Sequence, residues 1–161
     1  MTLKELQRYL TSAGIEWEHG ARGSVVAILP GEKKLRTTCA LTMGDLALTV
    51  NAFVARRPDE NHEAVYRWLL EQNRRTYAVA FSLDSVGDIY LTGRTPLHAI
   101  TEKEIDRILG CVLEYSDGAF NTILELGFAS SIRKEFAWRT AQGLPTDNLS
   151  AFAHLLEMPQ A

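Results

Sequence analysis

At 161 residues, the chain is long enough to form one domain with a buried core. Hydrophobic residues make up 46% of it and charged residues 23%, which is typical of a soluble globular protein. The 17 basic and 20 acidic residues give a net charge of -3, so no strong positive field is available to hold a phosphate backbone. This balance argues against general nucleic-acid binding.

The N-terminal stretch MTLKELQRYL contains no apolar run typical of a signal peptide. No apolar run elsewhere approaches the ~18 residues that a membrane span needs. Cys39 and Cys111 lie among apolar neighbours and outside any metal-binding spacing, so we interpret both as reduced core residues rather than as a disulfide. These features predict a cytoplasmic protein without a membrane partner.

An amphipathic helix is predicted over residues 2–13. Thr2 and Glu5 have the spacing of a capping box, and the leucines that follow recur on one face. Gly14 ends the pattern.

Three strands are predicted next, at residues 24–30, 35–43 and 46–54. The first is apolar on both faces, whereas the other two alternate with period two. On these two alternating strands, the residues predicted to face the helices are Leu35, Thr37, Cys39, Leu41, Met43, Leu46, Leu48, Val50, Ala52 and Val54. The short polar links between these strands indicate antiparallel pairing.

A second helix is predicted to begin at Pro58 and Asp59, with Glu60 and Glu63 near its positive N-terminal end. The helical period stops at Thr76.

The stretch AVAFSLDSVGDIYLTGRTPL, residues 78–97, then predicts a β-hairpin. Gly87 in its turn can adopt a positive φ. Val79, Phe81 and Leu83 alternate inward on the first strand.

A long helical region follows, opened by Thr101 and Glu104 as a second capping box. Its pattern loosens at residues 117–118, where the helix either kinks or runs through. Residues 149–156 form a possible terminal helix.

The resulting order is α-βββ-α-ββ-α. It predicts the α+β class, with an antiparallel sheet and helices packed on one of its faces.

No catalytic, metal or cofactor site is evident. The four histidines are scattered among different predicted elements, and no phosphate-binding, dinucleotide-binding or nucleophile motif occurs. We predict no cofactor and no enzyme activity. A dispersed site near His98 stays open as an alternative, because sequence alone does not reveal residues that only the fold brings together.

Two arginine doublets, 56–57 and 74–75, flank the second predicted helix. We interpret them as helix-end and loop charges. The alternative is a regulator that contacts nucleic acid through them.

One predicted surface stands out. The sheet face turned away from the helices carries small, uncharged residues: Thr38, Ala40, Thr42, Ala47, Thr49, Asn51, Phe53, Ala78, Ala80, Ser82, Tyr90 and Thr92. Such a face is either ordinary hydrated surface or an interface with a partner. We predict Thr49, Asn51, Phe53 and Tyr90 as partner-binding residues.

The stretch LLEQNRRTYAVAFSLDSVGDIYLTGRTPLHAITEKEIDRILGCVLEYSD resembles the YbjN family. In that family a helix tends to end near an Asn, which is Asn73 here. A hairpin follows, and then a long helix capped by Thr or Ser. The resemblance implies a type III secretion chaperone-like fold over roughly residues 2–135. We accordingly predict a YbjN-like domain at 1–138 and a C-terminal tail at 139–161.

The family resemblance also implies a small bacterial protein that regulates sensory transduction, with no catalytic residues to carry over. Chaperones of similar fold are homodimers that hold extended client segments. The leading hypothesis is therefore a non-enzymatic protein-binding module that acts as a homodimer on an unidentified protein client.

Overall fold

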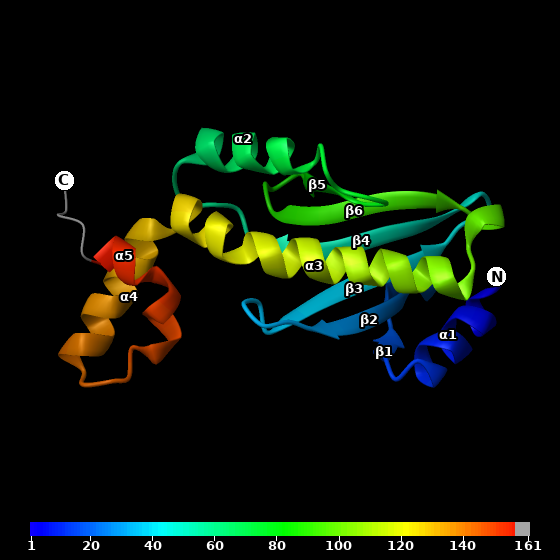
Figure 1. Ribbon diagram of the computed structural model, residues 1–161, viewed down its shortest axis with the longest axis horizontal. Helices are drawn as coiled ribbons and strands as arrows, with labels where there is room; N and C mark the ends of the chain where they lie inside the picture. The colour runs from blue at the N-terminus through cyan, green and yellow to red at the C-terminus, as the bar shows by residue number, and fades with distance from the viewer. Residues whose placement is uncertain (157–161) are drawn as a thin grey trace.

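The computed structural model describes residues 1–156 and contains one mixed sheet-and-helix body followed by a group of C-terminal helices (Figure 1). The helices are α1 Leu3–Ser12, α2 His62–Gln72, α3 Glu102–Gly127, α4 Ala129–Ala141 and α5 Ala153–Leu156, with 3₁₀ turns η1 Ala21–Gly23, η2 Leu97–Ala99 and η3 Asp147–Phe152. The strands are β1 Glu16–His19, β2 Val25–Pro30, β3 Arg36–Met43, β4 Ala47–Ala55, β5 Ala80–Leu83 and β6 Ile89–Pro96.

The strands form one six-stranded sheet in the order β1-β2-β3-β4-β6-β5, and every neighbouring pair is antiparallel. The 26-residue α3 runs across one face of this sheet (Figure 1). α2 lies beside β5, and α1 lies beside β1. The predicted α+β class, with an antiparallel sheet and helices on one face, is confirmed.

The capping box of α1 is present: the Thr2 hydroxyl accepts from the Glu5 amide, and the Glu5 carboxylate accepts from the Thr2 amide. Leu6 and Leu10 are fully buried beneath it. β1 was not predicted, because three of its four residues are polar or charged. Its order comes from backbone pairing with β2, and its charged side chains suit an exposed sheet edge.

The core lies between α3 and the inner face of the sheet. Its fully buried residues on the strands and on α3 include Val25, Cys39, Leu41, Val50, Val54, Leu91, Ile105, Ile108 and Ile123. The Thr37 and Ser116 hydroxyls, both buried there, lie 3.0 Å apart and satisfy each other. Both cysteines are free: Cys39 is in the core, where burial raises its pKa to about 12, whereas Cys111 is only half-buried.

Three residues predicted to face the helices are exposed instead. Leu35 is 83% exposed, Leu46 86% and Leu83 44%. Leu35 and Leu46 precede the first residues of β3 and β4, so the strand pleat does not set their directions. Leu83 ends β5 beside the hairpin turn.

The prediction of where α2 starts was wrong by about one turn. The helix begins at His62 rather than at Pro58 and Asp59, because Asn61 adopts a left-handed conformation with φ 51°. The side-chain Nδ2 of Asn61 donates to the Leu126 carbonyl at the end of α3 and ties the chain before α2 to that helix.

The predicted hairpin is confirmed as β5 and β6, and Gly87 has φ 91° in its turn. α3 begins after Thr101, whose hydroxyl accepts from the Glu104 amide. The Glu104 side chain does not complete the predicted second capping box; it accepts from the Tyr77 hydroxyl at 2.9 Å. α3 runs through residues 117–118 and ends at Gly127.

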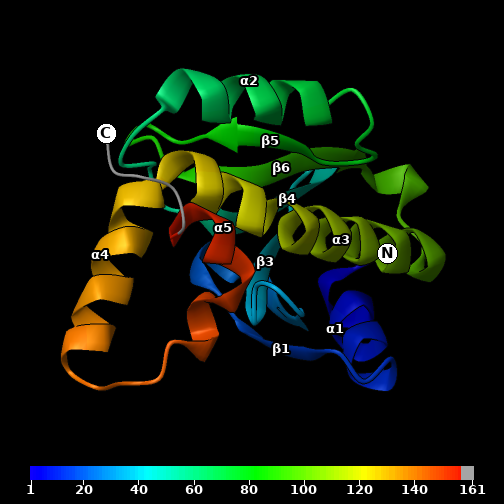
Figure 2. The same ribbon diagram turned by 60° about the vertical axis from the view of Figure 1, so that its left-hand side comes forward.

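Phe128 separates α3 from α4, and the C-terminal helices group together at this end of the molecule (Figure 2). They have their own small apolar cluster: Ala129, Ile132, Leu149, Phe152 and Leu155. The possible helix at 149–156 is observed as the end of η3 followed by α5. The predicted domain division between residues 138 and 139 falls within α4, and this division stays a prediction. Residues 157–161 of the predicted tail lie outside the described residues.

Candidate functional site

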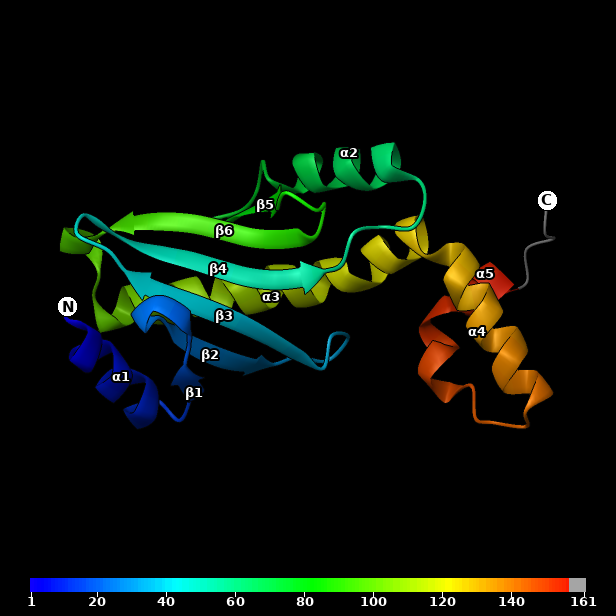
Figure 3. The same ribbon diagram turned by 180° about the vertical axis from the view of Figure 1, so that it is seen from behind.

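The four predicted partner-binding residues alternate with buried residues along β4 and β6, so they lie on the sheet face that points away from α3. Figure 3 shows the sheet from this side. Thr49, Asn51 and Phe53 follow one another on the same side of β4, because strand side chains alternate between faces. Tyr90 on β6 stands directly opposite Phe53. Within residues 1–156, no helix longer than a 3₁₀ turn crosses this face; η1 lies over it beside β3.

The Phe53–Tyr90 pair is the aromatic part of this open face and lies near the last residues of β4 and the first residues of β6. The two rings meet edge to face, with centroids 5.5 Å apart and an interplanar angle of 78°. Phe53 is 36% exposed, although its neighbours Ala52 and Val54 on the opposite face are fully buried. Large aromatic rings often anchor protein interfaces, and tyrosine is among the residues most enriched at such anchor points.

Uncharged side chains continue along the strands from the aromatic pair, while the Lys34 ammonium lies 5.8 Å from the centre of the Phe53 ring. Asn51 pairs with Thr92 on one side and with Ala40 on the other. The Ser82 and Thr92 hydroxyls, 3.0 Å apart, satisfy each other across β5 and β6.

Charges appear only towards the ends of the open face. Arg94 is exposed opposite Thr49. At the other end, burial and the nearby carboxylates of Asp84 and Asp88 raise the pKa of Tyr90. A neutral centre with charged borders fits the general anatomy of a protein interface.

No metal or catalytic cluster accompanies this face. Among residues 1–156, no group of three or more His, Cys, Asp or Glu side chains is placed to hold a metal ion. His98 is exposed in η2, and none of the hydrogen bonds or ion pairs found in that part of the chain involves its ring.

The arginine doublets lie at opposite ends of α2, which at 11 residues is about 16 Å long. The Arg56 guanidinium is held by the Asp59 carboxylate at 2.7 Å and lies 4.4 Å from the centre of the Phe128 ring. This distribution gives no continuous positive stripe along α2 of the kind that a phosphate backbone needs.

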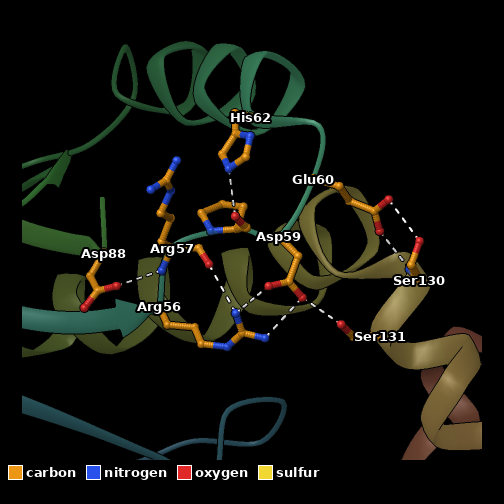
Figure 4. A network of polar contacts seen from close by, with 9 residues as sticks. Arg56, Arg57, Asp59, Glu60, His62, Asp88, Ser130 and Ser131 are labelled. Atoms are coloured by element: carbon orange, nitrogen blue, oxygen red, sulfur yellow. Dashed lines mark hydrogen bonds and ion pairs between the residues drawn. The ribbon is translucent and has the colours of Figure 1, made fainter. Parts of the chain in front are cut away.

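Two tertiary arrangements were not predicted from the sequence. One joins the β4–α2 loop to the start of α4, where Asp59 and Glu60 contact Ser131 and Ser130 (Figure 4). The other is Lys34, expected only in a polar turn, whose ammonium donates to backbone carbonyls of both β3 and β4. No local signal marks either one, because the partners are far apart in sequence.

Comparison with known proteins identifies relatives of the whole body. The family model YbjN, described as "Putative bacterial sensory transduction regulator", matches residues 2–125. A protein of Mycobacterium leprae (strain TN), described as uncharacterized, is 54% identical over 133 residues, which cover 83% of this chain and 72% of that protein. A protein of Mycobacterium tuberculosis (strain H37Rv), also described as uncharacterized, is 53% identical over 136 residues, covering 84% and 74%.

Three solved structures share the fold. The ExsC–ExsE complex matches with a TM-score of 0.54 and 19% identity, over 75% of this chain and 95% of that one. YbjN from E. coli matches with a TM-score of 0.56 and 11% identity, over 74% of this chain and 89% of that one. The HopA1–SchA chaperone–effector complex matches with a TM-score of 0.53 and 12% identity, over 72% of this chain and 91% of that one.

The family comparison places the chain among proteins described as regulators, and the solved structures show that it shares their fold. None of the helices in the described part of the chain is both long and apolar enough to span a membrane. On the family match over residues 2–125 and on the shared α+β fold, this chain belongs to the YbjN family.

Proposed function

We propose that this protein is a non-enzymatic, cytoplasmic protein-binding module that works as a homodimeric, chaperone-like adaptor or regulator. The open face of the sheet is its binding surface, with Phe53 and Tyr90 as anchors and with Thr49 and Asn51 beside them. The observation that carries this proposal is an aromatic pair, with Phe53 36% exposed and Tyr90 half-buried, on a sheet face whose middle is uncharged and which no long helix of residues 1–156 covers.

The physical argument is one of desolvation. An interface gains free energy when apolar area leaves water, and it loses free energy when charges are buried without partners. The middle of the open face offers small side chains and hydroxyl groups that are already paired, such as Ser82 with Thr92, and the Phe53–Tyr90 rings lie beside it. A partner that covers the middle of the face buries no charge there, and near the rings it meets the Lys34 ammonium, 5.8 Å from the centre of the Phe53 ring.

The fold neighbours support the proposal at the level of architecture. Two of them are solved as complexes, ExsC with ExsE and SchA with HopA1, and the second is described as a chaperone–effector complex. We carry over to this chain only the idea that its fold is suited to hold another polypeptide. The partner on the open face is either a second copy or a client.

The test compares charge insertion at the open face with charge insertion elsewhere. We expect Phe53→Asp and Tyr90→Asp to lower the population of dimer measured by light scattering during gel filtration, or to abolish recovery of the client in a native pull-down. Leu70→Asp is the matched control, because Leu70 is an apolar residue 66% exposed on α2, outside the open face.

If both open-face variants fold but dimerise and recover partners as the wild type does, the open face is not the interface. A Leu70→Asp variant that loses the partner while Phe53→Asp retains it would move the interface to α2.

A further inference from the structure

A second candidate site lies at the end of the sheet, between the body and the C-terminal helices. It is a cleft of about 590 Å³, within the size range of small-molecule pockets. Its apolar lining comes from β4, α3, α4 and η3: Phe53, Phe120, Leu124, Phe128, Ile132 and Leu149. Figure 1 shows the C-terminal helices beyond the end of the sheet from which the β2–β3 turn projects.

The sheet is split where it meets the cleft. The backbone pairing between β3 and β4 ends at Cys39 and Ala52. Beyond that pair, Arg36 on β3 has no partner on β4, and Phe53 on β4 has no partner on β3. Lys34 fills this split. Its Nζ donates to the Arg36 carbonyl at 2.9 Å and to the Phe53 carbonyl at 3.2 Å.

Lys34 contributes a positive charge that has no carboxylate partner in the described chain. The nearby Asp117 carboxylate accepts from the backbone amides of Lys33 and Lys34, both at 2.9 Å, and makes no ion pair with the Lys34 ammonium among residues 1–156. Burial lowers the pKa of Lys34. The ammonium is thus hydrogen-bonded by neutral groups but not neutralised.

The other charges that line the cleft are already paired. Arg56 is bound by Asp59 at 2.7 Å, and Glu135 is bound by Arg139 at 2.6 Å. Lys34 is therefore the one lining charge without a counter-ion among the described residues, and it is half-buried beside aromatic rings. A single negative charge on a ligand would complete this arrangement.

We propose that the cleft binds a small amphipathic monocarboxylate, with the carboxylate on the Lys34 ammonium and an apolar chain among Phe120, Leu124 and Phe128. The longest Lys34 contact, 3.5 Å to the Thr37 hydroxyl, is the one that a carboxylate oxygen replaces. The Thr37 hydroxyl keeps its partner Ser116, so no buried polar group loses its hydrogen bond.

The test is an amide NMR titration of the full chain with sodium decanoate and, separately, with decanol, which has the same chain length but no charge. We expect saturable shifts at cleft residues with decanoate and about tenfold or more weaker binding of decanol, which lacks the charge-assisted contact. Lys34→Met should remove this preference for decanoate.

Two further variants make the result specific. Lys33→Met removes the adjacent, exposed ammonium and should bind decanoate like the wild type. Leu124→Trp fills the cleft, keeps Lys34 and should weaken both probes. The proposal is overturned if decanoate does not bind saturably, if its shifts map outside the cleft, or if folded Lys34→Met retains the full preference for decanoate over decanol.

Binding of decanoate and association through the open face are separable outcomes. Tyr90 does not line the cleft, and Lys34 is not one of the predicted partner-binding residues. A Tyr90→Asp variant that loses the partner but still binds decanoate would support both proposals independently.

Discussion

At the residue scale, two glycines show why the same residue type has different roles in this chain. Gly93 on β6 lies directly against the Ala78 carbonyl, so a Cβ at position 93 would collide with backbone. Ala78 itself has φ 66°, inside a three-residue turn in which the Val79 amide donates to the Tyr77 carbonyl at 2.8 Å. Gly110, in the middle of α3, has open space where a Cβ would stand.

We therefore expect opposite effects from the same substitution. Gly93→Ala should lower the free energy of unfolding by about 1–3 kcal/mol, because backbone has to move to admit the methyl group. Gly110→Ala should raise it by roughly 0.5–1 kcal/mol, because alanine loses less conformational entropy in a helix. Urea unfolding measures both, and equal shifts of the same sign would contradict the close approach at Gly93.

At the element scale, the start of α4 depends on side chains from another part of the chain. Phe128 occupies its N-cap position and has no side-chain acceptor for the free amides. Glu60 supplies one: its carboxylate accepts from the Ser130 amide at 2.7 Å and from the Ser130 hydroxyl at 3.0 Å (Figure 4). The β4–α2 loop thus caps α4 and attaches it to the body.

Removing this cap should loosen α4 without unfolding the sheet. We expect Glu60→Ala to cost about 1 kcal/mol of local stability, as the loss of an N-cap does. Faster hydrogen exchange at the first amides of α4 would report it. Glu63→Ala is the control, since Glu63 is exposed on α2 and, among residues 1–156, forms an ion pair with Arg67 alone. Similar exchange in both variants would argue against the cap.

The same junction should respond to acid. The hydrogen bond from Arg56 and then that from the Ser131 hydroxyl lower the pKa of Asp59 to about 2. Because this folded-state pKa lies below the ordinary value, the contribution of Asp59 is complete above about pH 4 and is lost as pH falls through about 2.

The amide and side-chain NMR signals of Ser131 should follow this titration, and Asp59→Asn should abolish it. Since Asp59 is exposed, high salt should weaken the contribution of the Arg56 pair. A Ser131 response centred near pH 4 in the wild type would show that the Arg56 contact is not maintained in solution.

At the scale of the whole molecule, two apolar clusters share the chain. The larger one joins α3 to the sheet and includes the fully buried Ile108. The smaller one lies within the C-terminal helices and includes Phe152. Leu124 near the end of α3 packs against both clusters.

Matched truncations should separate the two clusters. Ile108→Ala should lower global stability by about 2–5 kcal/mol, because it leaves a cavity in the main core. Phe152→Ala should increase hydrogen exchange in α4 and η3, while amides of the central strands keep their protection. If the Phe152→Ala variant instead loses protection from hydrogen exchange uniformly, the molecule unfolds as one unit. That result would contradict independent opening of the C-terminal helices.

Much of this architecture was predictable, because the signals concerned are local. The period-two patterns at residues 35–43 and 46–54 predicted two strands and most of their buried side, and Thr2 with Glu5 predicted the start of α1. β1 was not predicted, because its strand conformation depends on backbone pairing with β2 rather than on a local sequence pattern. Leu35 and Leu46 were assigned to the core because periodicity does not show where a strand begins.

The sequence by itself determined the α+β class, the hairpin, the helical faces and the set of uncharged residues that came to share the open face of the sheet. Each of these follows from spacing along the chain, since strands and helices repeat every two or 3.6 residues. Only the tertiary structure decided that Phe53 meets Tyr90, that Glu60 caps α4 rather than α2, and that Lys34 bridges β3 and β4. These contacts join residues distant in sequence, and their free energy exists only once the sheet and α3 have packed.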